Sequence, residues 1–115
     1  MAGSIIISHD QSWPVSSSVL DAVAELTQMA WPISEASSRD EVFSEVEVFK
    51  LIDLSSMSAA TFQLFTRTTI AAFSHLREFG PPVGWSPRAF TFLQTPWEYL
   101  IQLLKSDVRW EGEKV

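Results

Sequence analysis

The chain has 115 residues, no cysteine and a formal net charge of −6, and 46% of its residues are hydrophobic. This size and composition suit one domain around a single core and exclude a disordered protein, and no apolar run reaches the ~20 residues of a membrane-spanning helix. The negative charge argues against nucleic acid as a partner, because a phosphate backbone is met by lysine and arginine, and the lack of cysteine excludes disulfides and thiolate catalysis. We therefore predict a single cytoplasmic domain, residues 1–115, with flexible ends at 1–4 and 111–115.

The first predicted helix spans residues 18–30. Ser18 is a good helix cap, and Asp21 places an acid in the first turn, where the helix dipole favours it. Apolar residues then recur at helical spacing until Pro32 ends the pattern. Ahead of this helix, "SIIIS" at residues 4–8 could form a short strand.

The segment "SSRDEVFSEVEVFKLIDLSS", residues 37–56, has an ambiguous pattern. Ser38 and Glu41 have capping-box spacing, which predicts one or two helical turns over 39–44. From 45 to 53 the residues alternate and include β-branched side chains, which favours an extended segment that could pair with the strand at 4–8. Two sets of side chains would then face opposite ways: Glu45, Glu47, Phe49, Leu51 and Asp53 outward, and Val46, Val48 and Ile52 toward the core.

The strongest helix signal covers residues 58–79. Ser58 is its cap, and Gly80 followed by two prolines ends it. Beyond it, Pro87 starts a short helix, and the capping box that begins at Thr95 starts another, which runs to about residue 108. These elements predict a mainly α fold: a small single-domain bundle of about four helices, with at most a minor β-pair near 4–8 and 45–53.

No residue pattern in the chain names a reaction. His9–Asp10 lies near several serines, but the strained Gly-x-Ser-x-Gly turn of a hydrolase is missing, and His75 reads as a flanking or partly buried helix residue. Glu45 and Glu47 alternate with valines, whereas a calcium loop needs dense oxygen ligands and a glycine turn. We therefore expect no enzyme activity, no metal and no cofactor.

The five tryptophans leave two interpretations open. Trp13, Trp31 and Trp85 each adjoin a proline or lie in a Pro/Gly loop, so they could fold down as lids on a small core. Tryptophan is also enriched at binding hot spots, and Trp85 with Arg88 is the best candidate for such a role.

The acidity belongs to the first half of the chain. Residues 1–56 hold nine acids and two bases, whereas residues 57–115 hold five acids and six bases. Acids that alternate with apolar residues suit an interface with a basic protein surface, such as a nuclease active site. The predicted partner-binding residues are Asp40, Glu41, Glu45, Glu47, Phe49, Asp53, Trp85 and Arg88.

The segments "IDLSSMSAATFQLF" and "GWSPRAF", in a short acidic chain without cysteine, resemble the small immunity proteins that bacteria encode beside polymorphic or contact-dependent toxins. The resemblance covers about residues 38–110. It implies an intracellular inhibitor without activity of its own that binds one cognate toxin domain. Two alternatives stay open: a cytoplasmic adaptor or chaperone for a secreted effector, and a small enzyme or ligand-binding domain with a pocket around His75.

Overall fold

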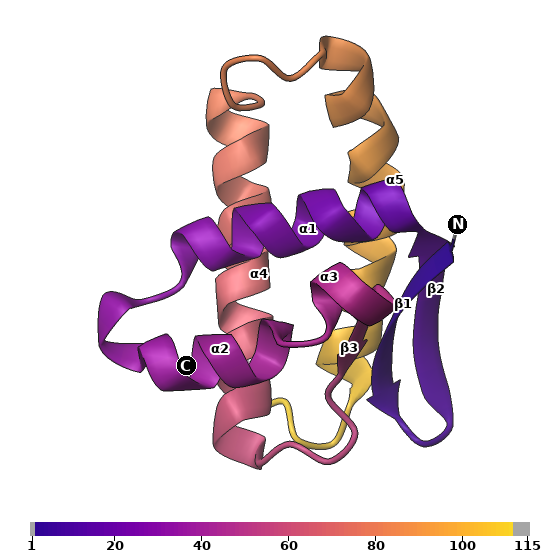
Figure 1. Cartoon of the computed structure of the whole chain (residues 1–115), viewed down its shortest axis with the longest axis vertical. Coiled ribbons are helices and arrows are strands. Elements are labelled where there is room, and N and C mark those ends of the chain that lie inside the picture. Colours follow the sequence, from indigo (N-terminus) through magenta and orange to yellow (C-terminus); the bar gives the residue numbers. More distant parts are fainter. Residues whose placement is uncertain (1, 112–115) are drawn as a thin grey trace.

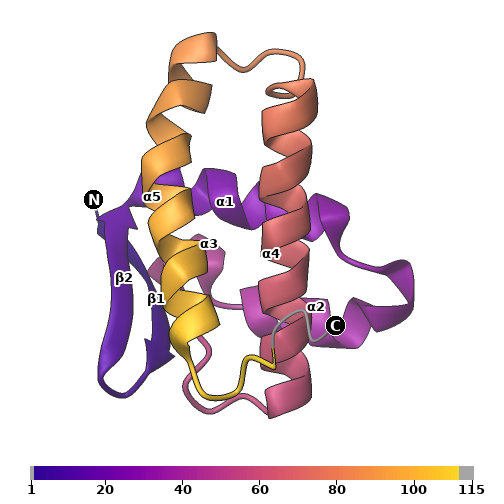
Figure 2. The same cartoon turned by 180° about the vertical axis from the view of Figure 1, so that it is seen from behind.

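The computed structural model describes residues 2–111 and places the helices in two layers beside a small sheet (Figure 1). The long helices α4 and α5 form an antiparallel pair, and the shorter helices α1, α2 and α3 lie across them. The elements in chain order are β1 (Ala2–Ser8), β2 (Gln11–Ser16), α1 (Ser17–Ala30), the 3₁₀ turn η1 (Ile33–Glu35), α2 (Ala36–Phe43), α3 (Val46–Phe49), β3 (Leu51–Asp53), α4 (Ala59–Phe79) and α5 (Pro87–Ser106). Seen from behind, α4 and α5 stand in front and the short helices lie behind them (Figure 2).

The sheet has the strand order β2-β1-β3, with β1 antiparallel to β2 and parallel to β3. Side chains of β1 alternate: Ile5 and Ile7 are fully buried, whereas the residues between and beside them are partly exposed. This period of two is the mark of a strand with one face on the core. Pro14, which has no backbone N–H, lies in the edge strand β2. An edge strand tolerates proline because it needs hydrogen-bond donors toward one neighbouring strand only.

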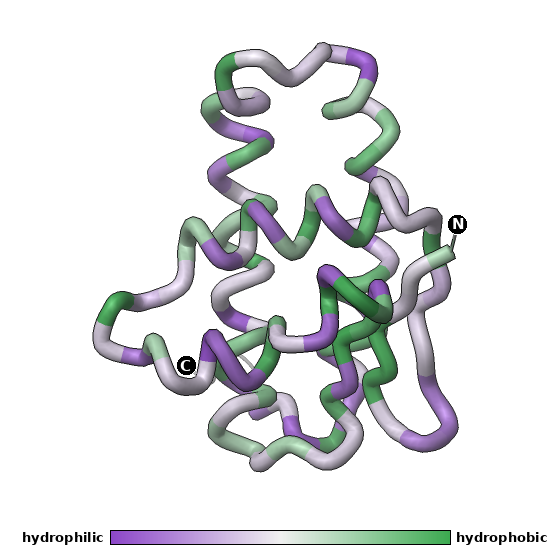
Figure 3. The backbone as a smooth tube through the Cα atoms, in the orientation of Figure 1, coloured by the Kyte–Doolittle hydropathy of each residue, from purple (hydrophilic) through white to green (hydrophobic). Residues whose placement is uncertain are grey.

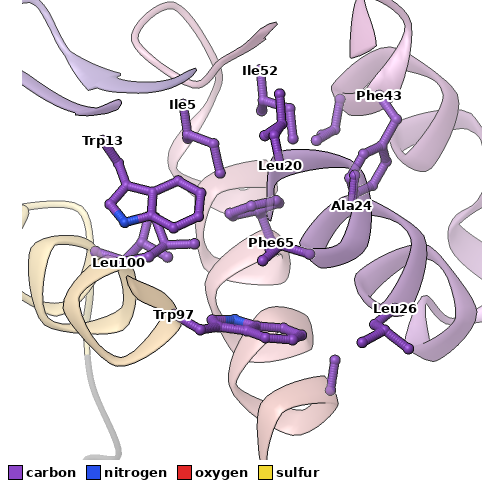
Figure 4. Close-up of a cluster of buried hydrophobic side chains, with 14 of the residues drawn as sticks. Ile5, Trp13, Leu20, Ala24, Leu26, Phe43, Ile52, Phe65, Trp97 and Leu100 are labelled. Atoms are coloured by element: carbon purple, nitrogen blue, oxygen red, sulfur yellow. The ribbon is translucent and has the colours of Figure 1, made fainter. Parts of the chain in front are cut away.

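Two tryptophans organise the core where the sheet meets the helices (Figure 4). Trp13 of β2 is 1% exposed, and its indole Nε1 donates a hydrogen bond of 2.9 Å to the Pro96 carbonyl of α5. Trp97 of α5 is fully buried, and its Nε1 donates to Thr69 Oγ1 of α4 at 3.0 Å. Thr69 Oγ1 also lies within hydrogen-bond distance of Thr27 Oγ1 of α1, at 3.1 Å. These hydrogen bonds link α1, α4, α5 and the β1–β2 hairpin, and they give each of these buried polar atoms a partner.

Arg109, beyond the end of α5, ties the C-terminal segment to the rest of the domain. Its guanidinium donates to the backbone carbonyls of Ile7 at 2.6 Å and Leu54 at 2.7 Å, and to the Asp107 carboxylate at 2.9 Å. The guanidinium carbon lies 4.1 Å from the ring centroid of Phe62. The hydrogen bonds from Arg109 hold the pKa of Asp107 below its ordinary value against the opposing effect of burial. We refer to Asp107 and Arg109 as the C-terminal clamp.

Several predictions from the sequence are confirmed. The helices expected at 18–30 and 58–79 are α1 and α4, and the fold is mostly helical. The predicted cap of the first helix is wrong, because Ser16 rather than Ser18 accepts the hydrogen bond from the Val19 N–H. The expected β-pair exists as well, because residues 4–6 of β1 pair with residues 51–53 of β3. Trp13 and Trp31 are buried, as the lid interpretation predicts. The sheet is larger than expected, since β2 adds a third strand.

The extended conformation predicted for 45–53 is wrong over its first part. Residues Val46–Phe49 form the helical turn α3, and Lys50 ends it in the left-handed region, with φ of 51° and its N–H bonded to the Val46 carbonyl. The helical turn points Val46 into the core but leaves Val48 75% exposed, so the predicted inward position of Val48 is also wrong. A period of two places 46 and 48 on the same face, whereas a helix does not.

The two separate helices predicted after residue 86 are one helix. Pro96 lies inside α5 rather than at a new start. The buried residues Leu93, Trp97, Leu100 and Leu104 continue one apolar stripe across it. Packing of that stripe outweighs the local capping-box signal.

The predicted flexible ends are only partly within the described chain. Residues 2–4 belong to β1, and Met1 and residues 112–115 lie outside the described residues.

Candidate partner-binding surface

The layer of short helices carries half of the 14 acidic side chains of the chain. Residues 17–50, from the start of α1 to the end of α3, hold seven acids and two bases. The hydropathy colouring shows hydrophilic segments along α1, α2 and α3 on the side of the molecule seen in Figure 3. The seven carboxylates are exposed, so this layer presents negative charge to the solvent.

An open groove of about 540 Å³ lies between α1 and α3. We call it the acidic groove; its lining is Asp21, Ala24, Glu25, Gln28, Met29, Val46, Glu47 and Lys50. Lys50 Nζ pairs with the Asp21 carboxylate at 3.1 Å. Within residues 2–111, Glu25 and Glu47 have no ion-pair partner, so two uncompensated carboxylates face the groove.

The predicted residues of α2 and α3 are on this same layer. Glu41, Glu45, Glu47 and Phe49 are all exposed, and Phe49 keeps 67% of its surface in water. Glu45 stands at the N-terminus of α3 but makes no side-chain capping bond there. These side chains are therefore available to a partner.

Two further predicted acids already have partners in the folded chain. Asp40 lies 3.3 Å from the Arg39 guanidinium. Asp53 Oδ1 accepts hydrogen bonds from the backbone N–H and the hydroxyl of Ser55, at 2.9 and 2.5 Å. This arrangement is an Asx-turn that shapes the chain after β3, which gives Asp53 a role within the fold.

Trp85 and Arg88 are not brought together with the acids. They lie at the loop between α4 and α5, on the other side of α1 from α2 and α3 in both views (Figures 1 and 2). Trp85 is partly buried and packs against the core, and Arg88 is exposed in the first turn of α5. The structure therefore places the eight predicted residues in two separate regions.

A second groove, of about 550 Å³, lies on the other side of α1, against the C-terminal half of α4. We call it the apolar groove; it is lined by Leu26, Met29, Ala30, Ala71, Ala72, His75, Leu76, Phe79 and the segment 80–83. Met29 lines both grooves. The sequence analysis did not predict this groove, because its walls come from α1 and from α4 with the segment after it, which are far apart in the sequence.

The candidate catalytic residues from the sequence stand apart from any reactive arrangement. His9 and Asp10 form the exposed turn of the β1–β2 hairpin, where a hydrogen bond of 2.7 Å from the Ser8 hydroxyl holds the pKa of Asp10 below its ordinary value. His75 is exposed, its ring lies 4.7 Å from that of Phe79, and no carboxylate lines the groove it borders.

Metal-binding and membrane-spanning features can be checked over the described part of the chain. Between residues 2 and 111 no three His, Asp or Glu side chains gather closely enough to hold a metal ion. None of the helices described there is long and apolar enough to cross a bilayer.

No protein-family model and no curated protein matches the sequence. Among solved structures, the chain is similar to a chain of the complex described as the CdiA-CT toxin from Burkholderia pseudomallei E479 with its cognate CdiI immunity protein. The match covers 93% of this chain and 97% of that chain, with a TM-score of 0.74 and 24% sequence identity. The likeness shows that this chain shares its fold with a chain of that toxin–immunity protein complex.

Proposed function

We propose that this chain is an immunity protein that binds a cognate toxin domain of the CdiA-CT kind and covers its active surface. The observation that carries the proposal is the shared fold over nearly the whole length of both chains. In this proposal, the chain inhibits the toxin by binding it, without catalysis, and it does so in the cytoplasm.

The charge of the short-helix layer supports a basic toxin surface as its target. Carboxylates at Glu25, Glu41, Glu45 and Glu47 are exposed and, within residues 2–111, unpaired. Charge of one sign over a surface speeds encounter with a surface of the other sign and disfavours wrong partners. A nuclease active site, which must hold a phosphate backbone, is a basic surface of this kind.

The test is co-expression of the chain with the toxin domain encoded next to it on the chromosome. Induction of the toxin domain alone should stop growth, and co-expression should restore it. The CdiA-CT toxin from Burkholderia pseudomallei E479 serves as the non-cognate control, and expression of this chain alone should leave growth unchanged. Growth arrest by this chain alone, or a neighbouring gene that encodes secretion machinery instead of a toxin, would contradict the proposal.

The double substitution Glu45→Lys/Glu47→Lys tests the acidic layer directly. It should slow association with the toxin domain by about 10-fold at low salt and flatten the dependence of the association rate on salt. Stopped-flow or surface-plasmon measurements at several salt concentrations supply the rates. The matched control is the double substitution Glu78→Lys/Glu98→Lys, which reverses two exposed charges on α4 and α5. Equal rates for the double variant and the unaltered chain at every salt concentration would remove these residues from the interface.

A further inference from the structure

We infer that the apolar groove between α1 and α4 receives an apolar side chain of the toxin domain, carried on a segment whose neighbouring residues are basic. The inference rests on the proposed function and extends it from charge attraction to an anchoring contact. It assigns a role to a surface that lies outside the predicted acidic segment.

The groove exposes apolar side chains that folding has left in water. Phe79 is 68% exposed, Met29 is 71% exposed, and Val83 is completely exposed. All three belong to the lining of one groove of about 550 Å³. Covering apolar surface in a concave site is favourable because it removes that surface from water. Hot spots of protein interfaces lie in pockets of this kind.

The wall of the groove is held in shape before any partner arrives. Gly80 ends α4 with φ of 80°, and its N–H donates to the Leu76 carbonyl at 2.8 Å. Pro81 and Pro82 follow, and their rings restrict the backbone that leads to Val83. A wall with few conformations loses little entropy on binding, which favours tight association.

Continuity with the acidic groove identifies the chemistry of the occupant. Met29 borders both grooves, so a segment that crosses α1 at Met29 has the apolar groove on one side and the carboxylates of Glu25 and Glu47 on the other. An apolar side chain flanked by lysine or arginine matches both environments.

The same charges argue against the other occupants. A second copy of this chain would bring its own net charge of −6 to a surface that already carries uncompensated carboxylates. The groove also does not suit a polar small molecule. Ligand sites combine an apolar wall with several convergent polar groups, whereas His75 is the one ionisable side chain in the lining of this groove.

The experiment compares two phenylalanines with the same exposure. Phe79 lines the apolar groove and Phe92 lies on α5 outside both grooves, and each is 68% exposed. Phe79→Ala should weaken binding to the neighbouring-gene toxin domain by about 10- to 30-fold, mainly through faster dissociation, because truncation of an anchor acts on the dissociation rate. Phe92→Ala should leave the dissociation constant within about two-fold, as expected for a residue outside the interface.

A second pair of variants places a charge where the anchor should sit. Ala71→Asp puts a carboxylate into the groove lining, and Ser74→Asp puts one on the neighbouring exposed surface of α4. Ala71→Asp should weaken binding by at least as much as Phe79→Ala, and Ser74→Asp should not. Thermal unfolding of all four variants should match that of the unaltered chain, since these positions are exposed.

The possible outcomes separate the two proposals. If the toxin domain binds, and binding responds to Glu45→Lys/Glu47→Lys but not to Phe79→Ala or Ala71→Asp, the anchoring inference is overturned and the immunity function stands. If the toxin domain does not bind at all, the immunity function fails and the inference fails with it. If light scattering shows a dimer that Phe79→Ala disperses, the occupant is a second copy and the inference is overturned.

Discussion

The long helices and the short helices of this protein differ in what they contribute. α4 and α5 span 21 and 20 residues and include two acids and four bases, whereas residues 17–50 hold seven acids and two bases. The long pair contributes Phe62, Phe65 and Trp97, which are among the largest fully buried side chains. α2 and α3 together bury Val42, Phe43 and Val46.

The helix ends show the same contrast. Ser58 and Ser86 accept hydrogen bonds from the first turns of α4 and α5, but no side chain caps α2 or α3. Side-chain caps typically add about 1 kcal/mol each to helix stability. The long helices are thus supported both locally and by packing, while α2 and α3 depend on a few buried side chains and leave their polar faces free for a partner. The helix α1 resembles the long pair in this respect, because Ser16 caps it and five of its residues are buried. Stability and recognition therefore lie mainly in different parts of the molecule, and substitutions can separate them.

The largest expected effect is the loss of the core tryptophan of α5. Trp97→Ala should lower the free energy of unfolding by about 3–5 kcal/mol, because a fully buried indole leaves a cavity and the Thr69 hydroxyl loses its donor. Urea denaturation gives the change, and Tyr99→Ala, at a half-exposed position on the same helix, should cost far less. A loss from Trp97→Ala no greater than that from Tyr99→Ala would show that α5 does not anchor the fold.

Removal of the C-terminal clamp should come next. Arg109→Met should lower the free energy of unfolding by about 2–4 kcal/mol, since the Ile7 and Leu54 carbonyls and the Asp107 carboxylate all lose a charged donor. Hydrogen exchange should locate the loosened region at β1 and at the segment after β3. Uniform exchange across the chain, with an unchanged free energy, would contradict the role of the clamp.

The clamp also predicts a dependence of stability on pH. Folding lowers the Asp107 pKa from its ordinary value of 3.8, so its stabilising contribution is complete above that value and is lost as the pH falls through the lower folded pKa. Asp107→Asn should remove this part of the acid-induced loss of stability. The check is the free energy of unfolding of both proteins measured from pH 6 down to about pH 2, and parallel curves would assign the acid sensitivity to other carboxylates.

The smallest effect concerns Trp85, which lies in the loop of the long-helix pair and was predicted to bind the partner. Its partial burial against the core leads us to expect that Trp85→Ala lowers the free energy of unfolding by about 1–2 kcal/mol and leaves the toxin dissociation rate unchanged. Thermal denaturation and dissociation kinetics of the same variant decide between the two roles. A faster dissociation with unaltered stability would extend the interface along the α4–α5 loop from Val83 to Trp85.

The candidate site was only partly foreseeable from the sequence. Glu41, Glu45 and Glu47 were predicted from the charge imbalance, and all three are exposed on the short-helix layer. Asp53 has the same charge, but its bonds to Ser55 could be recognised only in the folded chain. The apolar groove was missed because residues of α1 and α4, distant in sequence, together form its walls.

The sequence alone yields the helices α1 and α4, the serine cap of α4, the alternating segments that contain β1 and β3, and the charge imbalance between the two halves. These are local or compositional properties, so periodicity and capping rules reach them. Tertiary structure alone decided that 46–49 turn as a helix, that α5 continues through Pro96, and that Met29 borders two grooves. Each of these outcomes depends on which distant side chains share the core, and the burial of Trp97 and its neighbours outweighs local preferences of a few kcal/mol at most.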